Sequence, residues 1–67
     1  MLKISLNGTE QRIEPSTSVA TLLAANGYAQ RKVAVEINHE IVPRSAHAQR
    51  LIHDGDSVEI VHALGGG

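Results

Sequence analysis

The sequence predicts an α+β fold, a mixed sheet of about four to five strands with one main helix packed across it. Alternating apolar and polar residues indicate strands in both halves of the chain. Between them, residues 19–26 carry apolar side chains at helical spacing. The 67 residues suffice for one domain. A single core of this size supplies only about 3–5 kcal/mol of stability.

The first two strands are predicted to form a hairpin. Residues 1–6 alternate with their apolar side chains on one face, and residues 9–13 return as a more polar strand suited to a sheet edge. Asn7-Gly8 between them strongly indicates a type I′ turn, which needs positive φ at both central residues. Pro15 ends the second strand, because proline cannot donate to the ladder.

The predicted helix has signals at both ends. Residues 16–18 offer hydroxyl groups for its N-cap. Gly27 fits the position after the last turn, where a left-handed residue ends a helix. Val19, Leu22 and Leu23 share the face that is expected to lie on the sheet.

A second pair of strands follows the helix. Residues 33–38 alternate, with Val33, Val35 and Ile37 on the side expected to face the core. A turn is predicted at residues 38–40. The apolar pair at residues 41–42 then forms a short strand that ends at a proline.

The last part of the chain contains one ambiguous segment. Residues 45–50 fit either a loop or a single helical turn. Leu51 and Ile52 are expected to anchor this connection to the core. Residues 54–56 predict a turn, and residues 57–64 predict the last strand.

The order strand, strand, helix, strand, short strand, strand indicates the β-grasp architecture, because the helix must cross between parallel strands. The final strand is then expected at the centre of the sheet, beside the first. Val58 and Ile60 would point into the core. Val61 and Ala63 would lie on the face that the helix leaves open.

Composition argues against several classes of function. No cysteine is present, which excludes disulfides, thiolate metal sites and a cysteine nucleophile. The net charge is −1, no basic block occurs and Tyr28 is the only aromatic residue, so nucleic-acid binding is not expected. No segment is long enough to span a membrane, and the first residues lack the apolar core of a signal peptide. We therefore expect a cytoplasmic protein without membrane partners.

Several polar residues could suggest catalysis or metal binding, but each has a simpler explanation. Asp54 and Asp56 flank a glycine, which favours a turn, and the hydroxyl groups of residues 16–18 favour capping over nucleophilic catalysis. Arg44 and Arg50 could bind a phosphate or a carboxylate of a partner, although a solvated or locally bonded side chain is the favoured explanation. The histidines show no metal-binding spacing and are expected at the surface: His39, His47, His53 and His62.

Three glycines close the printed sequence, directly after the last predicted strand. Glycine has no Cβ, so such a tail is slim, and three residues reach at most about 10 Å. We expect a domain over residues 1–64 and a flexible tail over residues 65–67 that carries a terminal carboxylate into the active site of a partner. Exposed apolar side chains beside the tail would form a docking patch: Val61, Ala63 and Leu64.

Six segments carry a resemblance that covers nearly the whole chain: Asn7-Gly8, Leu22-Leu23, residues 33–38, residues 41–45, residues 54–61 and the closing glycines. With these segments the chain resembles the ThiS family, the ubiquitin-like sulfur carriers of thiamine biosynthesis. The combination of residues 41–45 and 54–61 is the most specific part, since many ubiquitin-like proteins end in diglycine. Residues 46–50 are the least family-like, and they lie away from the tail.

The resemblance implies chemistry at Gly67, with Gly65 and Gly66 threading the active sites of partners. An enzyme related to the ubiquitin-activating class would use Mg-ATP to adenylate the terminal carboxylate. A cysteine desulfurase or a rhodanese-type persulfide protein would then supply sulfur, and the resulting thiocarboxylate would deliver it to thiazole synthase. The chain itself would be a co-substrate rather than an enzyme. It would bind no cofactor or metal, since no glycine-rich loop leads into a helix.

Other functions stay open for a chain with this ending. One is a carrier like the small subunit of molybdopterin synthase, which uses the same terminal chemistry but is usually longer. Another is a ubiquitin-like modifier joined to lysines, whose tail would be found in amide linkage to other proteins. A plain β-grasp interaction module would tolerate the loss of Gly67.

Overall fold

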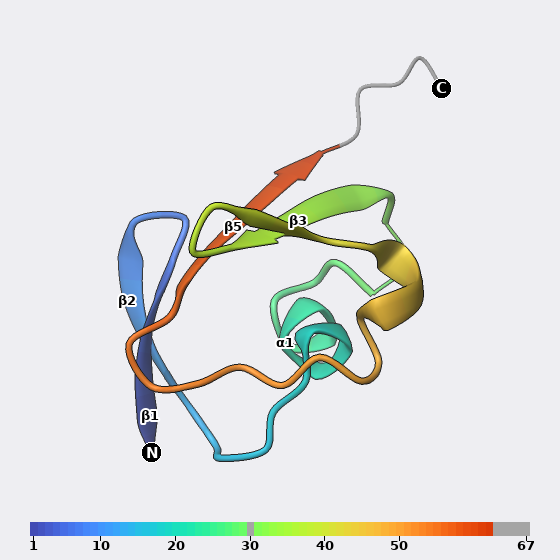
Figure 1. Ribbon diagram of the computed structural model, residues 1–67. Coiled ribbons are helices and arrows are strands. Elements are labelled where there is room, and N and C mark those ends of the chain that lie inside the picture. Colours follow the sequence, from blue (N-terminus) through green and yellow to red (C-terminus); the bar gives the residue numbers. More distant parts are fainter. Residues whose placement is uncertain (30, 63–67) are drawn as a thin grey trace.

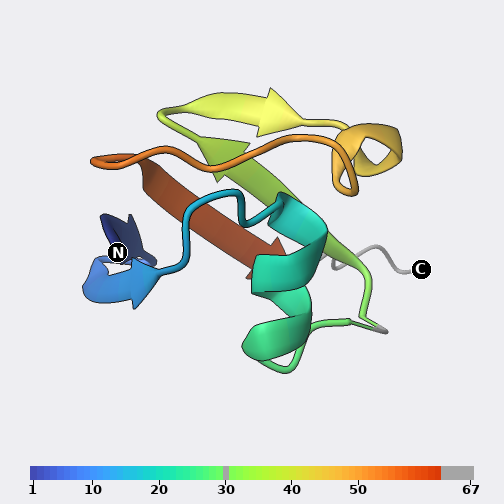
Figure 2. The same cartoon turned by 90° about the horizontal axis from the view of Figure 1, so that it is seen from below.

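A computed structural model of the chain describes residues 1–29 and 31–62. It contains one mixed sheet in the order β2-β1-β5-β3-β4, and the helix α1 lies across one face of this sheet (Figures 1 and 2). The predicted fold class is confirmed, including the central place of the last strand. In chain order the elements are β1 (Leu2–Leu6), β2 (Thr9–Ile13), α1 (Val19–Ala25), β3 (Val33–Ile37), β4 (Glu40–Val42), the 3₁₀ turn η1 (Arg44–Ala46) and β5 (Ser57–His62).

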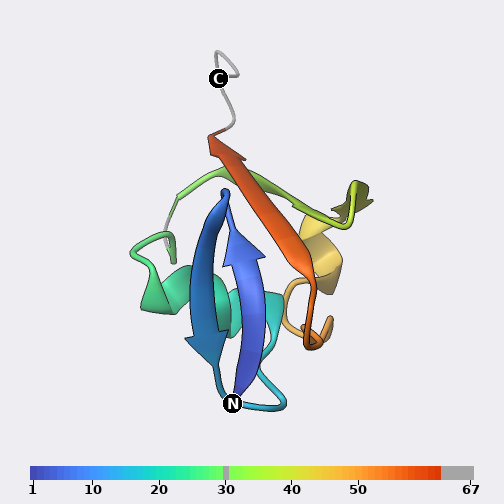
Figure 3. The same cartoon turned by 90° about the vertical axis from the view of Figure 1, so that its left-hand side faces the viewer.

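Strand β5 is paired on both sides. It runs parallel to β1, where Ser57 lies opposite Ser5, and antiparallel to β3, where His62 lies opposite Val33. Figure 3 shows β2, β1 and β5 side by side, with α1 behind them. The more polar β2 lies at the sheet edge, as its sequence predicted.

Both hairpins turn through residues with positive φ. Asn7 (φ 51°) and Gly8 (φ 85°) make the predicted turn between β1 and β2. Asn38 (φ 52°) and His39 (φ 71°) make the turn between β3 and β4 within the predicted range. The second turn therefore places a histidine where the first has a glycine.

The ends of α1 follow from its sequence. The Thr21 N–H donates to the Ser18 side-chain oxygen at 3.1 Å, so Ser18 is the N-cap among the three predicted candidates. Gly27 is left-handed, with φ 85°, and the Tyr28 N–H donates to the Leu23 carbonyl oxygen at 2.8 Å. This is the glycine-closed C-terminus that the sequence predicted.

The core lies between α1 and the sheet. Its buried apolar side chains are Ile4, Leu6, Ile13, Val19, Leu22, Leu23, Val35, Ile37, Val42, Ile52, Val58 and Ile60. Val33, which was expected to face the core with Val35 and Ile37, is only partly buried against it. No helix in the described residues has the length and apolar character needed to cross a membrane.

The connection from η1 to β5 departs from the prediction at two points. The helical turn begins at Arg44, one residue before the ambiguous segment. Ile52 is buried, but Leu51 is 43% exposed, so the expectation that both anchor this connection is wrong for Leu51. Leu51 lies in an isolated bridge opposite Ser18, where consecutive extended residues point to opposite sides and only Ile52 faces inward.

Candidate functional site

Strand β5 is held by side chains as well as by its ladders to β1 and β3. The Ile60 N–H donates to Oδ1 of Asn7 at 2.7 Å, and the Ser57 N–H donates to Oδ1 of Asn38 at 2.9 Å. One asparagine from each hairpin turn thus binds the backbone of β5. Beyond Val58, within the described part of the chain, only the ladder to β3 continues, as far as the pair Val33 and His62.

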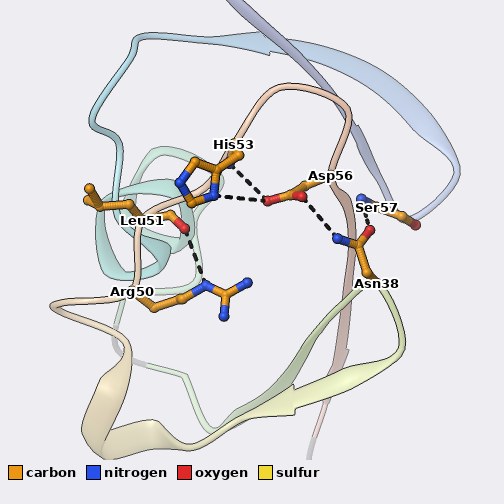
Figure 4. A network of polar contacts seen from close by, with 6 residues as sticks. All are labelled: Asn38, Arg50, Leu51, His53, Asp56 and Ser57. Carbon is orange, nitrogen blue, oxygen red and sulfur yellow. Dashed lines mark hydrogen bonds and ion pairs between the residues drawn. The ribbon is translucent and has the colours of Figure 1, made fainter.

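A polar network fixes the start of β5 (Figure 4). Asp56 is buried, and its carboxylate accepts hydrogen bonds from Nδ2 of Asn38 at 2.9 Å and from the N–H of His53 at 2.8 Å. Asp54 accepts a hydrogen bond from the N–H of Lys3 at 2.8 Å. Both carboxylates bind backbone N–H groups, and the predicted turn at residues 54–56 is confirmed.

The open face of the sheet carries exposed apolar side chains on β5 and on the strands beside it. Val61 is 59% exposed and lies opposite Ala34 on β3, which is also exposed. Ile41 is 73% exposed and lies opposite Glu36. The predicted exposure of Val61 is confirmed. Sequence reasoning missed Ile41, whose signal was its alternation with the buried Val42.

The rest of the predicted site lies outside the described residues. This applies to the docking residues Ala63 and Leu64 and to the tail residues Gly65, Gly66 and Gly67. Their roles stay predictions, and so does the docking role of Val61.

Three ionisable side chains meet at the centre of the open face. Glu36 and Glu59 are direct partners in the β3–β5 register, and His39 lies beside them, with one possible ligand atom from each residue within 4.8 Å of the others. Spacing along the sequence could not group them, because only the strand register brings them together. Two like charges directly opposite one another destabilise a sheet.

The histidine prediction is wrong at one position. His39, His53 and His62 are exposed, but His47 is only 8% exposed. Its Nε2 lies 3.1 Å from the carbonyl oxygen of Val42. A carbonyl oxygen only accepts, so the ring must donate from Nε2. The turn that starts with η1 brings this ring back onto β4.

Most of the remaining candidates have local partners in the described part of the chain. The Thr17 hydroxyl donates to the Glu14 carbonyl oxygen at 2.6 Å, and Ser18 caps α1, as expected for capping residues. Nε of Arg50 donates to the neighbouring Leu51 carbonyl oxygen at 3.3 Å, which confirms local bonding for that arginine. Arg44 is exposed at the start of η1.

Comparisons with known proteins agree with the fold. The ThiS family profile matches residues 4–67. The crystal structure of the thiamine biosynthesis protein (ThiS) from Geobacter metallireducens superposes with a TM-score of 0.85 and 35% sequence identity, and the match covers 98% of this chain and 100% of that one.

Two curated relatives show how this stretch occurs elsewhere. The sulfur carrier protein ThiS of Escherichia coli is 30% identical over 98% of this chain and 100% of its own length. The thiazole synthase of Paramagnetospirillum magneticum is 48% identical over 98% of this chain. The chain spans 20% of the length of the thiazole synthases that it matches.

Proposed function

The chain belongs to the ThiS family of sulfur carrier proteins, and from this premise we propose that the carboxyl group of Gly67 carries sulfur for thiazole formation. The family match over residues 4–67 carries this proposal. The chain acts as a co-substrate of other enzymes, in the cytoplasm, rather than as an enzyme itself.

The proposed chemistry begins with activation. A carboxylate oxygen of Gly67 attacks the α-phosphorus of ATP on a separate activating enzyme, which forms an acyl adenylate and releases pyrophosphate. A persulfide sulfur from a donor protein then attacks the acyl carbon and displaces AMP. A thiol cleaves the resulting acyl disulfide, which leaves the thiocarboxylate on this chain and a disulfide on the donor.

Thiazole synthase is the proposed recipient of the sulfur. The support is that a stretch 48% identical to this chain makes up 20% of a relative named thiazole synthase. The crystal structure of the thiamine biosynthesis protein (ThiS) that matches this chain with a TM-score of 0.85 supports the same scheme.

Intact-protein mass spectrometry tests the proposal. The protein isolated from its source is measured first, because the chemistry requires a free carboxyl group on Gly67. It is then incubated with the activating enzyme, Mg-ATP and a sulfur source, beside a variant that lacks Gly67. We expect a mass gain equal to the exchange of one oxygen for sulfur, absent from the variant. An unchanged mass with an active enzyme, or an amide-linked adduct with another protein, would reject it.

The docking role of Val61 has its own test. Val61→Asp is expected to raise the KM of the activating enzyme for this chain at least about tenfold, because a charge would enter an apolar contact. Thr21→Asp adds the same charge on an exposed position of α1 and serves as the control. Equal KM values for the two folded variants would remove Val61 from the contact.

A further inference from the structure

A hollow of about 360 Å³ lies on the helix side of the sheet, between α1, the start of β3 and η1. Leu23 and Val33 form part of an apolar floor, together with nearby alanines. Tyr28, Arg31 and Arg44 also line this hollow. We call this hollow the basic pocket.

The two arginines of the basic pocket are not engaged within the described residues. Arg31 and Arg44 are exposed, and neither takes part in an ion pair or a side-chain hydrogen bond there. No described carboxylate lines the pocket. A guanidinium group is always charged and presents a planar fork that matches a carboxylate or a phosphate. The pocket therefore offers two free cationic forks above an apolar floor.

The basic pocket adjoins the end of β5. Val33, in its lining, is the register partner of His62, the last described residue of β5. The ring of Tyr28 lies 5.7 Å from the ring of His62, centroid to centroid, at an interplanar angle of 58°. The basic pocket is therefore adjacent to the last described residue of β5.

We propose that the basic pocket receives a glutamate or aspartate side chain from an extended segment of the partner that grips the chain beyond His62. The apolar floor favours a side chain with a hydrocarbon stem over a bare anion, and the two arginines select its carboxylate. The choice of partner rests on the proposed function, whereas the chemistry of the pocket does not.

A peptide titration tests the chemistry of the pocket. The full chain, labelled with ¹⁵N, is titrated with acetyl-Ala-Glu-Leu-Ala-amide, with the same peptide carrying Gln for Glu, and with inorganic phosphate. We expect the acidic peptide to shift the amide signals of Leu23, Tyr28 and Val33, while the neutral peptide and phosphate leave them in place. An equal response to phosphate would make the pocket a bare anion site and overturn the proposal, and so would shifts spread evenly over all basic residues.

Matched variants separate the pocket from general charge effects. Arg31→Gln with Arg44→Gln is expected to raise the dissociation constant of the acidic peptide at least about tenfold. Lys3→Gln with Arg12→Gln removes the same charge from the open face of the sheet. This variant is expected to change the dissociation constant of the acidic peptide less than about twofold. Equal changes in the two variants would overturn the proposal.

The same variants decide which partner is involved. The purified activating enzyme is then used as the probe in calorimetry. Its dissociation constant is expected to rise about tenfold for Arg31→Gln with Arg44→Gln, but not for Lys3→Gln with Arg12→Gln. Peptide binding without thiocarboxylate formation would keep the pocket and reject the proposed function. If the thiocarboxylate forms but Arg31→Gln with Arg44→Gln binds the peptide and the enzyme as tightly as the unaltered chain, the proposed function stands and the proposed role of the basic pocket is rejected.

Discussion

The two hairpin turns on either side of β5 begin with the same type of residue but differ in the residue that follows it. Each begins with a left-handed asparagine whose Oδ1 accepts a hydrogen bond from a backbone N–H of β5. In the first turn the next residue is Gly8, which reaches φ 85° without strain. In the second it is His39, which holds φ 71° against the steric preference of a residue with a Cβ.

The asparagines also differ in what else they bind. Asn7 makes its bond to Ile60 near the end of β5, whereas Asn38 binds Ser57 and also donates to the buried carboxylate of Asp56. The comparison teaches that two turns with the same left-handed asparagine can differ in what that side chain binds and in the residue that follows it. The second turn is the more strained of the two and also the more connected.

Asn38→Ala is expected to have the largest effect, a loss of about 2–4 kcal/mol in the free energy of unfolding. The change removes the acceptor for the Ser57 N–H and a donor to Asp56, and it leaves alanine at a left-handed position. Urea denaturation measures the loss. A loss no larger than that of Asn7→Ala would show that the bond to Asp56 adds nothing.

Asn7→Ala is expected to cost about 1–3 kcal/mol, because the Ile60 N–H loses its acceptor within the sheet. Asn7→Asp keeps an oxygen at the same place and is the matched control, with a smaller expected loss. The comparison between the turns would fail if both variants lost the same stability in urea denaturation.

Exchanges at the second turn positions test the strain. Gly8→Ala is expected to lose about 1 kcal/mol, for conformational reasons alone, since nothing lies within 4 Å of an added Cβ. His39→Gly is expected to gain about 0.5 kcal/mol, since relief of strain exceeds the added flexibility of the unfolded chain. Thermal unfolding of both variants measures these changes. A destabilised His39→Gly would show that its side chain contributes more than its conformation costs.

Glu59→Gln is expected to have the smallest effect, a gain of about 0.5 kcal/mol, because it removes the repulsion between Glu36 and Glu59. Glu14→Gln changes the net charge equally at an exposed position and is the control. Urea denaturation at low and high salt measures the difference, which salt should reduce. If Glu59→Gln and Glu14→Gln gained the same stability, the cause would be the net charge and not the repulsion between Glu36 and Glu59.

The sequence predicted those elements whose signals are local. Asn7-Gly8 predicted a turn from two residues, and Gly27 predicted the end of α1, because left-handed backbone favours glycine in both places. The alternation of β5 predicted that Val58 and Ile60 are buried and that Val61 is exposed.

Predictions failed where the answer depended on distant contacts. The burial of His47 requires Val42 to present its carbonyl oxygen from β4, which no pattern within residues 45–50 reveals. Leu51 and Ile52 are similar in sequence terms, and only the bridge to Ser18 decides which one faces the core. The meeting of Glu36 with Glu59 depends on strand register across most of the second half of the chain.

The parallel arrangement of β1 and β5 determines how the domain bears mechanical load (Figure 3). Tension between the start of β1 and the end of β5 pulls these neighbouring strands in opposite directions along their length. Their linking bonds, from the Ser5 N–H to the Asp56 carbonyl oxygen at 3.0 Å and from the Asn7 N–H to the Val58 carbonyl oxygen at 2.9 Å, are then sheared together rather than opened one at a time. A pull on the end of β5 with the start of β1 held therefore loads both bonds at once, while the ladder to β3 supports the other side of β5.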